Sequence, residues 1–345
     1  MKQGQNVEQM LNKINSDVKK KIDFIVGIKK IKVEETASVF PNITFDKTKG
    51  NLTDLSLVQL CNKLEIGSSY LVNKCLPLSQ NLVVHNLRFW LDAVKKRNVM
   101  VRTYQEDTST TVRAILSDRY KRIDNDIIAT KSLNRILDMG AKLQYVNYDG
   151  DSLNITGVLP KIQGEIAKGD VVQGGVTITN NEVGGGSFQI KPFIYRLICT
   201  NGMVAPEYIG EFYAKHVGKK LINVQDDEQG EISIDKMFEQ VSLMNNPDMF
   251  YDLFEQMKKA KEKKTTSNEI VKLAKQHNLS DAERAGIFER LGKVYGDNFS
   301  VDNYSLANAI TNIANDEEKS DSRARFLQEL GGQIIFYQKP QYLRQ

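Results

Sequence analysis

A basic segment rich in aromatic residues lies between His85 and Asn125. It holds nine lysines and arginines against five carboxylates, and Phe89 and Trp90 lie among them. Cationic side chains contact phosphates and aromatic rings stack on bases, so this mixture is typical of proteins that bind single-stranded nucleic acid. The strand expected after the Gly184–Gly186 cluster adds further residues of the same kinds. The predicted nucleic-acid-binding residues are Lys95, Lys96, Arg97, Arg102, Arg113, Arg119, Tyr120, Lys121, Arg122, Lys191, Tyr195 and Arg196.

The same side chains also have a structural interpretation. Arginines that alternate with apolar residues are often ordinary outward-facing strand residues, with no ligand attached to them. In the helix expected over LVVHNLRFWLDAVKKRN, the spacing of Leu87, Trp90, Leu91 and Val94 places Trp90 on the apolar face. Each residue taken singly fits this interpretation, whereas the cluster as a whole favours binding.

Two glycine clusters between Gly174 and Val204 raise the alternative of a nucleotide site. A P-loop requires a lysine and a hydroxyl residue after its last glycine, and a dinucleotide fingerprint requires a following helix. The residues after Gly186 are SFQIKPFIYRLIC, which is strand-like, and Pro192 disfavours a helix there. Gly184–Gly186 therefore predicts a hairpin turn.

Catalytic and metal-binding patterns are weak. The three histidines, His85, His216 and His277, are far apart in sequence, and no G-x-S-x-G motif occurs. Asp118, Asp124 and Asp126 could hold magnesium in a nuclease, but the arginines between them favour ion pairing. We expect no catalytic residue, no bound metal and no cofactor, and an enzyme is the less favoured class.

The composition is that of an ordinary globular chain with a mild basic excess. The 345 residues carry a net charge of +4 and a pI of about 8.7. Three cysteines without a C-x-x-C pair fit a reducing compartment. The N-terminus has no apolar signal-peptide core, and no apolar run reaches the ~20 residues that a membrane span needs. We expect a cytoplasmic protein without a membrane partner.

The hydrophobic periodicity predicts an α+β fold, with antiparallel β-hairpins packed against helices. Three hairpins are expected: over 99–124, around Asp149-Gly150, and around the glycines of 184–186. A helix that ends at Gly140 is expected between the first two hairpins. A further helix is expected from Asp54, with Asp54 as N-cap and Gly67 as terminator, and its buried stripe is Leu57, Leu60 and Leu64.

The composition divides the chain into three predicted parts. These are an N-terminal arm over 1–53, an α+β core domain over 54–225 and a helical C-terminal region over 226–345. The last part opens with an amphipathic helix expected from Ile234 to Ala260. This helix ends in the run KKAKEKK, Lys258–Lys264, which is interpreted as a solvated helix end.

Several motifs in order resemble the phage/plasmid-like protein family, a family of unknown function found in phages, prophages and plasmids. They are RAILSDRYKRIDN, ITNNEVGGGSFQIKPFIYRLICTNGMV, NAITNIA and LQELGGQII, and the resemblance extends from about Asp54 to Ile335. At the level of fold, hairpins packed on a helix are also similar to single-strand annealing recombinases.

The resemblance implies a role in a phage or mobile element, in the host cytoplasm. The first hypothesis is binding of single-stranded DNA in recombination or annealing, by a protein that forms homo-oligomers as annealing proteins often do. The second is a non-enzymatic interaction or anti-defence protein that binds a host protein. The third is the metal-dependent nuclease.

Overall fold

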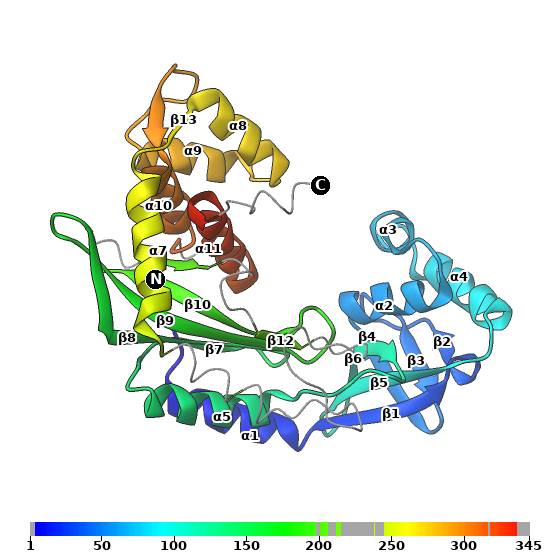
Figure 1. The fold of residues 1–345 in the computed structure, drawn as a ribbon. Coiled ribbons are helices and arrows are strands. Elements are labelled where there is room, and N and C mark those ends of the chain that lie inside the picture. Colours follow the sequence, from blue (N-terminus) through cyan, green and yellow to red (C-terminus); the bar gives the residue numbers. More distant parts are fainter. Residues whose placement is uncertain are drawn as a thin grey trace.

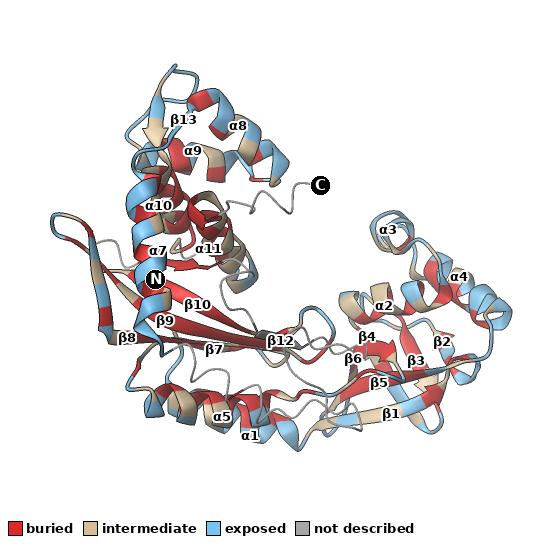
Figure 2. Ribbon diagram, viewed as in Figure 1, coloured by how far each residue is buried: buried red, intermediate tan, exposed pale blue. Residues whose placement is uncertain are grey.

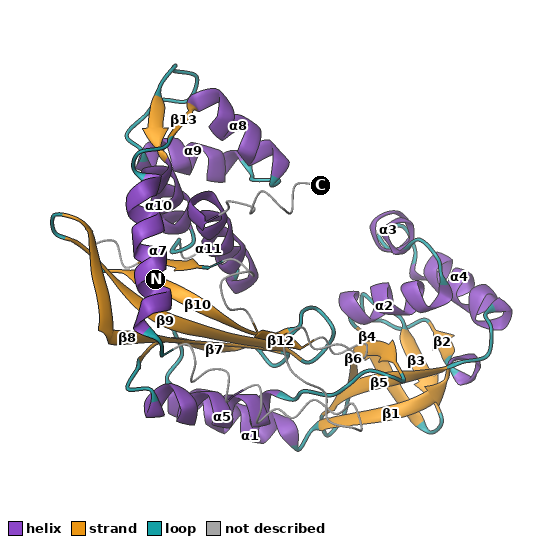
Figure 3. Cartoon of the chain, in the orientation of Figure 1, coloured by secondary structure: helices purple, strands orange, loops and turns teal. Residues whose placement is uncertain are grey.

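The computed structural model describes residues 4–197, 201–205, 212–214, 238, 245–316 and 318–336. Two β-sheets carry helices on their faces, and a group of helices follows at the C-terminal end (Figures 1 and 3). Apart from the parallel pair β4–β6, the strand pairs of this described part are antiparallel. The predicted α+β class is confirmed.

The first sheet has the strand order β1-β5-β6-β4-β3-β2. Helices α2 and α4 and a π-helical turn cover it, and their apolar side chains form one core with the strands, whereas the short helix α3 contacts α2 and this turn (Figure 2). The elements are β1 (Lys21–Gly27), the 3-10 turn η1 (Ile28–Lys30), β2 (Lys32–Glu34), β3 (Asn42–Phe45), β4 (Thr48–Leu52), α2 (Asp54–Leu64), α3 (Ser68–Tyr70), η2 (Leu71–Cys75), α4 (Gln80–Ala93), β5 (Asn98–Gln105) and β6 (Thr110–Ser117).

Helix α2 has the predicted apolar stripe but different ends. Leu57, Leu60 and Leu64 are buried, as expected. The N-cap is Thr53 and not Asp54, because the Thr53 hydroxyl and Ser56 form a reciprocal capping box. The helix stops at Leu64 and not at Gly67, since Glu65 adopts the left-handed conformation with φ 61° and caps the C-terminus.

The second sheet is larger and has the order β11-β10-β9-β8-β7, with β12 also paired to β10. The hairpin turns contain Gly150 and Gly184, with φ 108° and 78°, so both predicted hairpins are confirmed. The strands are β7 (Lys142–Tyr148), β8 (Ser152–Ala167), β9 (Asp170–Asn181), β10 (Phe188–Arg196), β11 (Asn201–Val204) and β12 (Phe212–Ala214).

Helices α1 (Val7–Val18) and α5 (Asn125–Asp138) lie side by side along one face of this sheet (Figure 1). Met10 and Ile14 of α1 and Ile128 of α5 are in its main apolar core. Helix α5 is followed by Gly140 at φ 69°, as its sequence predicts. Because α1 leads directly into β1, and β6 leads into α5, the chain crosses between the two sheets twice here.

The C-terminal helices form a third apolar cluster and also cover the β11 edge of the large sheet. The first part of the helix expected over 234–260 lies outside the described residues, and the described helix begins at Pro247. The elements are α7 (Pro247–Ala260), β13 (Lys264–Thr266), α8 (Ser267–Gln276), α9 (Asp281–Arg290), β14 (Ser300–Asp302), α10 (Asn303–Ile313) and α11 (Asp321–Phe336).

The predicted three-part division stays a prediction. Strands β1–β4 belong to the segment expected as an N-terminal arm, yet they share a sheet with β5 and β6. Among the helices that the structure describes, none has the length and apolar character required to cross a bilayer.

Gly174 lies inside β9 and not in a turn, because α7 packs closely over it. A Cβ atom at Gly174 would be 2.6 Å from Cδ1 of the fully buried Phe250. Gly174→Ala is therefore expected to lower the free energy of unfolding by about 1–3 kcal/mol, the usual cost of overpacking. Urea unfolding measures this, with the exposed Gly186→Ala as control, and equal stabilities of the two variants would contradict the packing.

Candidate nucleic-acid interface

Arg102 and Arg113, two of the predicted nucleic-acid-binding residues, are buried where the two sheets meet. Their exposed fractions are 2% and 5%. The guanidinium of Arg102 donates to Asp23 Oδ1 at 3.0 Å, to Asp124 Oδ1 at 2.6 Å and to the backbone oxygen of Glu182 at 2.8 Å. These partners come from β1, the start of α5 and the end of β9, so one side chain joins both sheets.

Glu182 is the centre of this junction, with a side chain that is 1% exposed. Its carboxylate is 2.5 Å from Arg113 Nη2 and 2.7 Å from Lys21 Nζ, and it accepts from the backbone N–H of Asn125 at 2.7 Å. Arg113 is also 2.6 Å from Asp151. We call this set the junction network: Lys21, Asp23, Arg102, Arg113, Asp124, Asp151 and Glu182.

The electrostatics of the junction network indicate a structural role. Burial alone would lower the pKa of the Arg102 guanidinium, but the attraction of Asp124 and Asp23 outweighs it and raises that pKa. Burial lowers the pKa of Lys21 despite the opposing attraction of Glu182. Because carboxylates of the network already pair with both buried cations, we assign Arg102 and Arg113 to the junction and not to a nucleic-acid surface.

Three other predicted residues are similarly buried. Tyr120 is 5% exposed and donates to the backbone oxygen of Glu182 at 3.0 Å, and burial raises its pKa. Lys191 is 5% exposed and lies 3.1 Å from Glu329 of α11. Tyr195 is 7% exposed and accepts a hydrogen bond from Gln144. We assign all three to the fold in place of the predicted contact.

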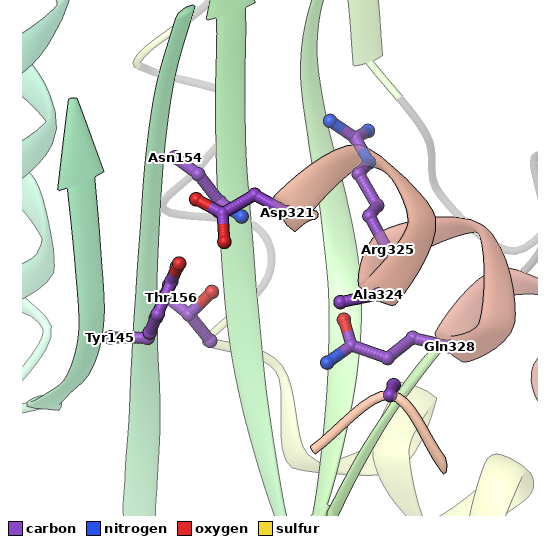
Figure 4. A pocket seen from close by; sticks show the side chains of 8 residues that line it. Tyr145, Asn154, Thr156, Asp321, Ala324, Arg325 and Gln328 are labelled. Carbon is purple, nitrogen blue, oxygen red and sulfur yellow. The ribbon is translucent and has the colours of Figure 1, made fainter. Parts of the chain in front are cut away.

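Lys191 pairs with Glu329 because α11 lies against the large sheet, and further polar contacts join this helix to the strands. Across the sheet, Asn147, Asn154, Thr179 and Gln189 are paired in register. The first turn of α11 lies over them, with Asp321 accepting from Asn147 and Arg325 donating to Gln189. Figure 4 shows Asp321 pointing toward Asn154. Both residues line a cavity of about 20 Å³. That volume suits a single water molecule, so this cavity is a packing feature.

The remaining predicted residues lie at the surface or close to it. Lys95, Lys96 and Arg119 are exposed, and Lys121 is half-buried. Arg122 is 3.5 Å from Asp23 at the margin of the junction network. Arg97 is half-buried and lies 3.5 Å from the exposed Glu65. Arg196 is paired with Asp170. It lines a groove in the C-terminal part of the molecule.

Phe89 and Trp90 are exposed on α4, contrary to the core position expected for Trp90. Their exposed fractions are 66% and 40%. The two rings contact each other edge to face, with centroids 5.4 Å apart and planes at 90°. The reason is that α4 already fills the core with Val83, Val84, Leu87 and Leu91, which leaves Trp90 at the margin of the stripe.

The topology gathers cations at the end of the first sheet where α4 stops. There Gly27 of β1 pairs with Asn98 of β5, and Lys29 Nζ donates to the backbone oxygen of Asp92 at 3.0 Å. Ser117 of β6 pairs with Val99, which brings Arg119 to the same end. We call these residues the basic end: Lys29, Lys30, Lys63, Lys95, Lys96, Arg97 and Arg119. The exposed acidic residues of the same segments are Glu65, Asp92 and Asp118, so cations outnumber acids at this end.

Lys63 is a half-buried residue of α2 at the basic end. Its pKa is lowered chiefly by burial and further by the repulsion of Arg97, against the attraction of Asp118. Lys29, Lys30 and Lys63 were missed from sequence because they lie far along the chain from the 85–125 segment. The spacing of residues gives no sign of them: the pairing of β1 with β5 brings Lys29 and Lys30 to this end, and the packing of α2 on β6 brings Lys63.

The acids of the nuclease hypothesis do not converge. Asp124 is bound by Arg102, whereas Asp118 is exposed and lies before the turn that leads to α5. Within the described residues, no three histidine, cysteine or acidic side chains are arranged to hold a metal ion. Cys61 is buried, and burial raises its thiol pKa to about 11, which disfavours a nucleophilic thiolate.

Comparisons with known proteins find no family model, no curated protein and no solved structure that matches this chain. The resemblance to the phage/plasmid-like family therefore stays a prediction.

Proposed function

We propose that this protein binds single-stranded nucleic acid through the basic end and the exposed Phe89–Trp90 pair. The observation that carries the proposal is an exposed aromatic pair beside a cluster of cations. Aromatic rings at a surface offer stacking platforms to bases, and nearby lysines and arginines contact the phosphates between them. Duplex bases are already stacked on each other, so a single strand is the expected ligand.

The geometry supports this assignment in two ways. Phe89 and Trp90 follow each other on the last turns of α4, immediately before Lys95 and Lys96, so aromatic and cationic groups lie within a short reach. The helix also lies on the opposite side of the molecule from α7, α8 and α9 (Figure 1). A single-stranded nucleic acid bound at the basic end would therefore not contact these C-terminal helices.

The test is binding of a labelled thymidine oligonucleotide, followed by fluorescence anisotropy at two salt concentrations. If Lys29, Lys30, Lys95 and Lys96 each contact a phosphate, log affinity falls against log salt with a slope of about −3, from roughly 0.7 per phosphate. Affinity then drops roughly 50-fold between about 50 and about 200 mM salt. A duplex of the same sequence should bind more weakly.

The matched variants separate this site from general positive charge. Lys95→Ala with Lys96→Ala is expected to reduce the slope to about −1.4. Lys161→Ala with Lys168→Ala removes the same charge from exposed positions on and after β8, and should leave the slope unchanged. Absence of binding at low salt, or equal slopes in the two double variants, would contradict the proposal.

The wider role is proposed from the sequence resemblance alone. It places single-strand binding in recombination or annealing within a phage or mobile element, with homo-oligomers as the working form. Mixing two complementary strands with the protein and following duplex formation tests annealing. A protein that binds a host protein is the alternative, and it is favoured if no oligonucleotide binds.

A further inference from the structure

A second basic site lies in the C-terminal part of the molecule, as a groove of about 540 Å³. It is lined by residues from the end of β10, the β13–β14 ribbon, the end of α9 and one side of α10; Figure 1 labels β10, β13, α9 and α10. A volume of this size is within the ~300–1,000 Å³ range of small-ligand sites. The cations that line it are Arg196, Lys264, Arg290 and Lys293.

The lining of this groove has an excess of positive charge. Its carboxylate is Asp302, which caps α10 by accepting from the backbone N–H and the hydroxyl of Ser305, both at 2.8 Å. Lys264 and Lys293 are exposed at the groove. Asp170 and Asp316 pair with the two arginines, so the charge that an anionic ligand would balance is mainly that of Lys264 and Lys293.

The two arginines are held in position by Asp170 and Asp316, which lie outside the lining, and by the lining residue Asn312. Arg196 donates to both carboxylate oxygens of Asp170, at 2.7 and 2.8 Å, and Tyr304 donates to the same carboxylate at 2.9 Å. Arg290 donates to Asn312 at 2.7 Å and to Asp316 at 2.6 Å. The carboxylates hold both guanidinium groups in place, which limits the freedom lost on binding, but they also offset the charge of the arginines, so Lys264 and Lys293 are the main donors for an anion.

The donors of the groove favour phosphate over a single carboxylate. Lysine and arginine bind phosphate oxygens by charged hydrogen bonds, and several cations around one volume suit a ligand with several phosphate groups. The exposed Lys261 and Lys263 extend the charge beyond the groove. The run KKAKEKK, interpreted from sequence as a solvated helix end, thus continues into β13, where Lys264 lines the site.

We propose that this groove binds clustered phosphate groups, from either a free polyphosphorylated molecule or the backbone of a nucleic acid. The site shares no residue with the basic end. It therefore does not depend on the function proposed for Phe89 and Trp90.

The experiment titrates the full chain with inorganic triphosphate by calorimetry, and with a labelled oligonucleotide by anisotropy. Lys264→Ala with Lys293→Ala is expected to weaken the binding of the responsible probe by about ten-fold or more, because charged hydrogen bonds are lost. Lys275→Ala on α8 is the control for exposed charge. Lys264→Glu with Lys293→Glu should abolish binding, and thermal unfolding checks that each variant folds.

The outcomes distinguish the two sources of phosphate. Triphosphate binding that the double variant loses identifies a free phosphorylated ligand. Loss of oligonucleotide affinity alone identifies a backbone site, and Trp90 should still respond to the oligonucleotide in that variant. If neither probe binds, or if the double variant binds both probes as the unaltered protein does, the groove is not a phosphate site. None of these results tests the basic end, which is tested separately by the Lys95→Ala, Lys96→Ala double variant.

Discussion

Replacing Glu182 with alanine is expected to lower the free energy of unfolding by about 3–5 kcal/mol, the cost of removing one partner of a buried ion pair. The carboxylate lies 2.7 Å from Lys21 and 2.5 Å from Arg113, and both cations are buried with it. Without it, Lys21 and Arg113 repel each other in a site of low polarity, and the backbone N–H of Asn125 loses its acceptor. Urea unfolding followed by circular dichroism measures the change.

The control for this prediction is Glu289→Ala, which removes an exposed carboxylate from α9 and should change stability little. Arg113→Ala is expected to destabilise the protein in the same way as Glu182→Ala. The folded fraction of Arg113→Ala should still bind nucleic acid with unchanged affinity. If the Arg113→Ala protein is stable but binds nucleic acid more weakly, Arg113 contacts the nucleic acid. That result would contradict its structural role in the junction network.

Replacing both Phe89 and Trp90 with alanine is expected to weaken single-strand binding by at least about ten-fold. Each stacked base contributes roughly 1–3 kcal/mol by alanine substitution, and about 1.4 kcal/mol is a factor of ten. The loss should appear at every salt concentration, since the lysines of the basic end remain. Because Phe89 is 66% exposed and Trp90 is 40% exposed, the loss of stability should be smaller than for a fully buried aromatic residue.

The matched control for the aromatic pair is Tyr251→Ala, which removes an exposed ring from α7, far from α4 along the chain. It should bind oligonucleotide as the unaltered protein does. Equal affinities of the Phe89→Ala, Trp90→Ala double variant and the Tyr251→Ala variant would show that stacking makes no contribution. Binding would then rest on charge alone.

The elements of the fold follow from local signals in the sequence. The stripe of Leu57, Leu60 and Leu64, the Asp149-Gly150 turn and the glycine after α5 each predict a feature that the structure confirms. Helix ends were less well predicted, because Thr53 and Asp54 are both good N-cap residues and Glu65 is an uncommon left-handed cap. These signals depend on neighbouring residues only.

The candidate site could be predicted only in part, since its geometry depends on distant residues. Arg102 donates to the backbone oxygen of Glu182, eighty positions away in the sequence. No local sequence signal near either residue predicts this contact. One signal was present: β5 and β6 are apolar on both faces, as strands covered on both sides are. An arginine within such a strand is expected to be buried and paired.

Trp90 gives the most direct measurement of the proposed function, because it is the single tryptophan of the chain. Its emission is to be followed while a thymidine oligonucleotide is added at low salt and then at high salt. Stacking of a base on the exposed indole predicts a saturable loss of emission at low salt that is reversed by salt. Binding detected by anisotropy without any change in Trp90 emission would contradict an interface at the end of α4.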